Sequence, residues 1–290
     1  MQWLWAALTA AMMTITGVGA QITSDTRAAD LLKQARAALG GEAALAAVKG
    51  LTCSGTFRRD AGGRDLSGDI KIDLAIPDRY LQTESMNPVG DATIVVERGV
   101  NGDTLLSRSR TLGGAPGMML RIATPDTPDA RAQAVRAAKA DLTRLTMALL
   151  MTSPAMPLEM SYAGEADAPD GSKADALDAK GAGSFAAQLF LDRTSHRPLM
   201  LAYRGIGPRV VMRTTRQPPA GAPSPETQHE ALPPPRVVDI NWYFDDYRQV
   251  DGIWLPYHVS KSIEGKPAEE WTFTSVKVNP TFDANTFSAK

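Results

Sequence analysis

The chain has 290 residues, of which 43% are hydrophobic and 22% charged, and its formal net charge is -1. This composition is that of an ordinary globular protein, and it excludes a disordered or collagen-like chain. A near-neutral chain without a run of lysine or arginine also lacks the basic surface that binds nucleic acid, so we expect no nucleic-acid partner.

The N-terminal segment predicts export. Between Trp3 and Gly19 the chain carries no charged residue, and small residues precede Gln21. Such a segment is typical of a signal peptide, so we expect cleavage after Ala20 and a single domain over residues 21–290. An uncleaved anchor is the alternative, because the apolar run approaches the ~17 residues that can just span a bilayer.

Cys53 is the only cysteine, so the chain cannot form an internal disulfide. An exported protein without disulfides fits a bacterial periplasm. We interpret Cys53 as a small apolar residue of the first strand rather than as a reactive thiol.

The first predicted elements are helices. Asp25 can cap a helix that keeps apolar residues at helical spacing and ends at Gly40-Gly41. Residues 42–48 predict a second, short helix. The period then changes to two, which predicts strands over residues 51–59, 70–76, 80–85, 94–98 and 104–108. Asn101-Gly102 between the last two is a hairpin signal, since both residues tolerate positive φ.

A long helix is expected next. Thr127-Pro128 predicts its start, because proline at the first helical position loses no hydrogen bond, and the apolar spacing runs to about Met151. Six of the 12 methionines of the chain lie between Met118 and Met160.

The second half of the chain predicts more strands, beginning near Leu158 and continuing over residues 185–191, 199–203 and 210–215. Residues 217–235 hold seven prolines and predict a surface loop. After it, alternating residues and two turn signals predict a three-stranded meander over residues 238–278. The fold class is therefore mainly β with α: a large antiparallel sheet accompanied by helices.

Catalytic signatures are absent from the sequence. There is no G-x-S-x-G elbow, no H-E-x-x-H and no cysteine pair, so we expect no catalytic residue, no metal and no cofactor, and the protein is predicted not to be an enzyme. The best general-base candidate is His258 with Asp246 or Asp251, but an ordinary sheet histidine is preferred. The acidic stretch Asp167, Asp170, Asp175 and Asp178 does not have calcium-loop spacing, and predicts a solvated hairpin.

Two groups of residues could build an apolar cavity. One is the end of the long helix, where flexible methionine suits variable acyl chains, and the other is the aromatic content of the final meander. A curved sheet covered by a helix could leave such a hollow. The alternative is that these side chains fill a solid core.

Several segments resemble those of the LolA-like superfamily, the bacterial outer-membrane lipoprotein-sorting proteins, and in particular its uncharacterised branch. They are Ala38-Leu39-Gly40-Gly41, Pro77-Asp78-Arg79-Tyr80, Leu189-Phe190-Leu191-Asp192 with Pro198-Leu199, Phe244-Asp245-Asp246-Tyr247-Arg248 and Val250-Asp251-Gly252-Ile253-Trp254-Leu255-Pro256. The resemblance implies an incomplete half-barrel of about eleven antiparallel strands, wrapped over helices that act as a lid. The long proline-rich segment departs from the compact carrier.

This resemblance implies a non-catalytic periplasmic binding protein that holds an acyl chain or a lipoprotein-like apolar ligand. The expected ligand-binding residues are Met147, Leu150 and Met151 on the lid, and Trp242, Phe244, Trp271 and Phe273 on the sheet. The alternative is an envelope protein-interaction or stress-sensor module of the same fold, which would contact another envelope protein through a sheet edge or the proline-rich loop.

Overall fold

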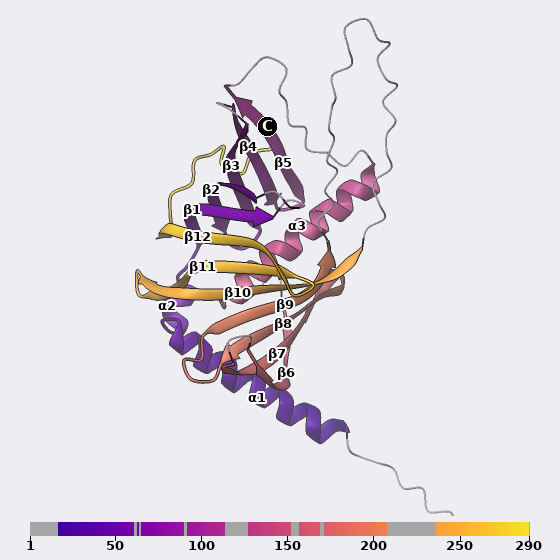
Figure 1. Ribbon diagram of the computed structural model, residues 1–290. Helices are drawn as coiled ribbons and strands as arrows, with labels where there is room; N and C mark the ends of the chain where they lie inside the picture. The colour runs from indigo at the N-terminus through magenta and orange to yellow at the C-terminus, as the bar shows by residue number, and fades with distance from the viewer. Residues whose placement is uncertain are drawn as a thin grey trace, which may run out of the picture.

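The computed structural model describes residues 17–60, 63, 65–89, 92–113, 127–151, 157–168, 171–207 and 236–289. Its strands form one 12-stranded antiparallel sheet, which is curved and does not close into a barrel (Figure 1). The predicted fold class is confirmed, with twelve strands in place of about eleven. The predicted strand at 210–215 and the loop at 217–235 lie outside the described residues.

The helices are α1 (Gly17–Ala38), α2 (Glu42–Ala46) and α3 (Pro128–Ala148), with a short 3-10 turn η1 (Ala182–Ser184). The strands are β1 (Gly50–Asp60), β2 (Asp65–Ala75), β3 (Arg79–Val89), β4 (Ala92–Asn101), β5 (Thr104–Leu112), β6 (Glu159–Asp167), β7 (Lys173–Gly181), β8 (Phe185–Asp192), β9 (Pro198–Ile206), β10 (Val237–Val250), β11 (Ile253–Ile263) and β12 (Lys266–Val278).

The sheet consists of two meanders joined at one place. Its strand order is β5-β4-β3-β2-β1-β12-β11-β10-β9-β8-β7-β6, so every neighbouring pair except β1 and β12 is consecutive in the sequence. The joining pair runs from Leu51 opposite Val278 to Arg59 opposite Glu269, with a register shift between Ser54 and Gly55. Strands from the two halves of the chain therefore meet in the middle of the sheet.

The first helix differs from its predicted start. It begins at Gly17, and Asp25 is an exposed residue inside it rather than its cap. The sequence between them contains no proline, so nothing stops the helix from extending upstream. Cleavage after Ala20, which would remove the first turn of this helix, stays a prediction.

Gly40 fixes how α1 joins the sheet. It has a φ of 127°, and a Cβ there would lie 2.5 Å from the backbone oxygen of Gly252. Glycine is required on both counts, because it has no Cβ and tolerates positive φ. The Trp254 N–H donates to the Leu39 oxygen at 2.9 Å, which ties the end of α1 to the start of β11.

The concave face of the sheet carries the main core. The alternating side chains Val238, Ile240, Trp242 and Phe244 of β10 are buried there, together with the buried face of α1 and parts of α3. On the opposite, convex face, Phe282 and Phe287 from the end of the chain pack over β2, β3 and β5.

The predicted solvated hairpin of acidic residues is wrong for Asp175, which is only 3% exposed. Its carboxylate lies 3.6 Å from Arg27 and 3.8 Å from Arg193, and the Tyr162 hydroxyl donates to it at 3.1 Å. A carboxylate with these partners can be buried, because the positive charges and the hydrogen bond replace its interactions with water. Asp170 lies outside the described residues.

The described part of the chain contains no helix that is long and apolar enough to span a membrane.

Candidate functional site

Helix α3 lies against the concave face of the sheet (Figure 1). It starts as predicted: Thr127 is the N-cap, its Oγ1 accepts from the Ala130 N–H at 3.2 Å, and Pro128 is the first helical residue. The helix buries Leu142 and Met147 against the sheet.

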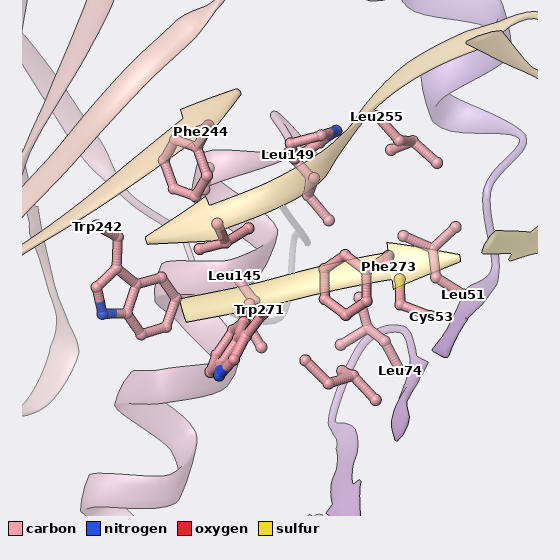
Figure 2. Close-up of a pocket in the computed structure, with 14 residues that line it drawn as sticks. Leu51, Cys53, Leu74, Leu145, Leu149, Trp242, Phe244, Leu255, Trp271 and Phe273 are labelled. Atoms are coloured by element: carbon pink, nitrogen blue, oxygen red, sulfur yellow. The ribbon is translucent and has the colours of Figure 1, made fainter. Parts of the chain in front are cut away.

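A small apolar cavity lies between the C-terminal half of α3 and the sheet (Figure 2). Its volume is about 50 Å³, which is several times the roughly 10–15 Å³ that one water requires but far below a pocket for a whole ligand. Every lining residue is apolar: Leu51, Cys53, Ile72, Leu74, Leu145, Ala148, Leu149, Trp242, Phe244, Leu255, Pro256, Val259, Trp271 and Phe273.

The four aromatic residues predicted from the meander all line this cavity. Trp242 and Phe244 come from β10, while Trp271 and Phe273 come from β12. Figure 2 shows them around one space with Leu145 of α3 and Leu149, the C-cap of that helix. Their alternation along each strand was the signal that placed them on one face.

The predicted lid residues lie elsewhere. Met147, Leu150 and Met151 are buried in the main core, with exposures of 0%, 2% and 3%, and do not line the cavity. The helix instead contributes Leu145, Ala148 and Leu149 to the cavity wall. These three share one helix face at spacings of three and four, a periodicity that methionine content does not reveal.

The aromatic rings form a continuous contact series. Tyr203 meets Trp242 edge to face at 6.1 Å between ring centroids, Trp242 meets Trp271 at 5.7 Å, and Trp271 meets Phe273 at 6.4 Å. Such pairs stabilise by about 0.5–1.5 kcal/mol each beyond the area they bury. The Trp271 Nε1 is buried without a hydrogen-bond partner among the described residues.

A partly buried ion cluster continues the concave face beyond Trp271. Arg59 pairs with Glu84, which is 2% exposed, and lies 3.6 Å from Glu269; Lys261 lies 3.6 Å from the other oxygen of Glu269. Two cations and two carboxylates balance here, which makes their burial tolerable. The concave face thus changes from apolar at the cavity to charged beyond it.

Asp141 and Arg144 of α3 lie over this charged end. Arg144 donates to Asp141 at 2.7 Å, and its guanidinium stacks 3.7 Å from the centre of the Tyr203 ring. Desolvation raises the pKa of Asp141 despite the nearby charges of Arg144 and Lys261. Desolvation likewise raises the pKa of Tyr203, so its hydroxyl stays protonated.

Cys53 lies in the cavity wall. Burial, with a smaller contribution from the charge of Asp73, raises the pKa of its thiol to about 12. At neutral pH almost no thiolate is present, which agrees with a packing role.

His258 is paired with Glu270 rather than with Asp246 or Asp251. Its Nε2 lies 2.9 Å from Glu270, and the other oxygen of Glu270 lies 3.2 Å from Arg58. The hydrogen bond to His258 is the main cause that lowers the pKa of Glu270. Since His258 alternates with cavity-lining Val259, this pair lies on the convex face. No three His, Cys, Asp or Glu side chains in the described ranges are placed to hold a metal.

Comparison with known proteins finds similarity only among solved structures. No protein-family model matches the chain. No curated protein matches it either.

Three solved structures illustrate the similarity. A putative outer membrane lipoprotein-sorting protein domain from Vibrio parahaemolyticus is 9% identical, with a TM-score of 0.46, over 91% of this chain and 97% of that one. A DUF1329 family protein from Desulfovibrio piger is 11% identical, with a TM-score of 0.44, over 90% and 96%. A LolA superfamily protein from Nitrosomonas europaea is 9% identical, with a TM-score of 0.47, over 90% and 97%.

Proposed function

We propose that this protein binds an acyl chain or a similar apolar ligand between α3 and the concave face of the sheet, without chemical change to the ligand. The cavity of 14 apolar residues under α3 carries the proposal. Burial of apolar ligand surface there would contribute about 25 cal/mol per Å² to the binding free energy. The cost of ordering the ligand and of moving α3 away from the sheet reduces this contribution.

The cavity volume of about 50 Å³ defines how binding must occur. Only a few methylene groups fit while α3 stays in place, so a longer chain requires α3 to move away from the sheet. Leu145 and Leu149 would then be the residues that the ligand separates from Trp242 and Phe273. In this proposal the aromatic residues hold the ligand, and the helix is the movable lid.

Filling the cavity tests the proposal. Ala148→Leu places a larger side chain in the cavity wall, so we expect the affinity for 1-decanol to fall about tenfold or more, as calorimetry would measure. Ala132→Leu is the matched control, since Ala132 is an exposed residue of the same helix. The proposal is wrong if the wild-type protein does not bind 1-decanol, or if both variants bind it equally well.

We propose the periplasm as the place of this function, with cleavage after Ala20. The charge-free segment from Trp3 to Gly19 supports this placement. N-terminal sequencing of the protein recovered from the envelope would test it, and a mature chain that still began at Met1 would contradict it.

A protein-interaction or stress-sensor role is the second candidate. Both end strands of the described sheet, β5 and β6, have one neighbour each, and such edges can accept a strand from a partner. Deletion of residues 217–235 separates the candidates: loss of a co-purifying envelope protein with unchanged 1-decanol binding would favour the second, and the reverse result would favour the first.

A further inference from the structure

A second hollow lies between the sheet and the more N-terminal part of α3, from Gln133 to Arg144, where the sheet splits. β8 and β9 pair from Gln188 opposite Ala202 to Leu191 opposite Pro198. Residues 185–187 of β8 pair only with β7, and residues 203–206 of β9 pair only with β10. A groove of about 1200 Å³ lies at this divergence, between the strands and α3. This is large enough for a small-molecule ligand, since such pockets usually measure about 300–1,000 Å³.

Small side chains keep the groove open. Ala137 and Ala140 face it from α3, and Gly181, Ala186 and Ala187 border it from the β7–β8 hairpin. Larger residues at these positions would pack between helix and strands, as Leu145 and Leu149 do at the other end of α3. Phe185 and Tyr203 add aromatic surface, so much of the wall is apolar.

The side of the groove formed by α3 is basic. Arg144 is fixed there by its stacking on Tyr203 and its hydrogen bond to Asp141, and its guanidinium lies 5.7 Å from the Phe185 ring. The Arg144 Nε is buried and has no hydrogen-bond partner among the described residues. A buried guanidinium N–H without a partner is costly, and a small shift of Arg144 toward an anionic oxygen in the groove would satisfy it.

Arg136 extends this basic wall. It precedes Arg144 by eight residues, which places it about 12 Å along the same helix. It lines the groove, is exposed, and forms no ion pair within the described ranges. The remaining charges largely cancel, since Lys139 pairs with Asp103 and Arg204 lies 3.4 Å from Asp239, while Lys180 and Asp178 oppose one another in sign.

The groove and the apolar cavity adjoin each other. Tyr203 borders the groove, and its ring packs against Trp242, which lines the cavity. On the helix, Arg144 of the groove is followed directly by Leu145 of the cavity. One ligand could therefore reach both spaces past Trp242.

We infer that the groove holds the anionic head group of an amphiphile, with Arg144 contacting a carboxylate or phosphate and Arg136 attracting it from further along the helix, while the tail enters the apolar cavity. This inference rests on the proposed function, and it adds that the ligand is a single-chain amphiphile with an acidic head. The stacked Arg144 would orient the anionic head group through directional hydrogen bonds, and the exposed Arg136 would attract it over a longer range.

A series of ten-carbon ligands tests the inference by calorimetry: 1-decanol, decanoate and decyl phosphate, with acetate and inorganic phosphate as heads without a tail. Decanoate or decyl phosphate should bind at least about tenfold more tightly than 1-decanol, because charge-assisted hydrogen bonds form only with the anions. The preferred anion identifies the head group. The heads alone should bind far more weakly than the amphiphiles.

Variants assign the site. Arg144→Gln and, separately, Arg136→Gln should reduce the advantage of the anion over 1-decanol, measured within each variant as the ratio of the two dissociation constants. Because Arg136 is exposed, its variant keeps the test valid even if Arg144→Gln impairs folding. Arg248→Gln is the matched control, since Arg248 is an exposed arginine that pairs with Asp246 outside both spaces.

The outcomes distinguish the two proposals. If 1-decanol binds and the anions bind no better, or if Arg248→Gln has the same effect as the groove variants, the inference is wrong while the proposed function stands. If none of the amphiphiles binds, both are wrong.

Discussion

Cys53 offers a direct probe of the apolar cavity because it lies in the wall and is the only thiol of the chain. With its pKa raised to about 12, the thiol should react with iodoacetamide at pH 8 far more slowly than an ordinary cysteine, for which roughly a quarter is thiolate at that pH.

A bound ligand should slow this alkylation further, since it would occupy the space in front of the sulfur. Mass spectrometry of the alkylated protein measures both rates. An alkylation rate equal to that of the denatured protein would show that the thiol is not protected. The comparison with Cys53→Ser, which cannot be labelled, corrects for modification elsewhere.

The single residues of the cavity divide into those that the sequence could indicate and those it could not. Alternation in β10 and β12 predicts that Trp242, Phe244, Trp271 and Phe273 share one face, and they do. The helical residues were harder, because the face of α3 that meets the cavity depends on how the helix is rotated against the sheet. Met147 and Leu145 are only two positions apart, yet one is in the core and the other lines the cavity.

At the scale of elements, α3 is held at its C-terminal end by a contact with α1. Arg36 donates from Nη1 to the backbone oxygen of Leu150, just beyond α3, while its other nitrogens bind Glu42. Leu150 has a φ of 53°, so the chain turns sharply there. This contact ties the proposed lid to the fixed helix α1.

Removal of this tie should make α3 open more often. Arg36→Ala should destabilise the closed position of α3 by about 1–2 kcal/mol, because a charge-assisted hydrogen bond to a carbonyl is lost. Amide hydrogen exchange over residues 142–149 should then accelerate about tenfold relative to the wild type. Arg58→Ala is the control, since that arginine is exposed and lies on β1. Unchanged exchange in both variants would show that Arg36 does not hold α3.

Local signals predicted the start of α3 and the β4–β5 hairpin but not the start of α1, and contacts between distant elements were not predicted. Thr127-Pro128 predicts the start of α3, and Asn101-Gly102 predicts the β4–β5 hairpin, because capping and turn residues act on their immediate neighbours. The divergence of β8 and β9 has no such signal, since the sequence of each strand predicts an ordinary strand and does not indicate where its pairing with the neighbour ends. The groove it creates could only be seen in three dimensions.

On the scale of the whole molecule, the pairing of β1 with β12 joins the two meanders, and Gly55 lies at the bulge of this pair. A Cβ on Gly55 would lie 2.0 Å from the backbone oxygen of Thr272, which is rigid because it belongs to the sheet. Any side chain at this position must push the two strands apart.

Gly55→Ala should therefore lower the free energy of unfolding by about 2–4 kcal/mol, as measured by urea denaturation. Gly207→Ala is the matched control, because the nearest atoms there are side-chain carbons of Val238 at 3.3 Å, which can adjust. Equal stability of the two variants would mean that β1 and β12 are more loosely joined than the structure indicates.

The order of the strands also has a consequence in time. β1 is the first strand to be synthesised and β12 is the last, yet each is the other's neighbour. Until β12 has been synthesised, β1 carries an unpaired edge in the middle of what will become the sheet. Free strand edges attract other chains, so a newly made molecule is exposed to aggregation between the synthesis of β1 and that of β12. The edge of β1 must stay unfolded, or be shielded, until β12 can pair with it.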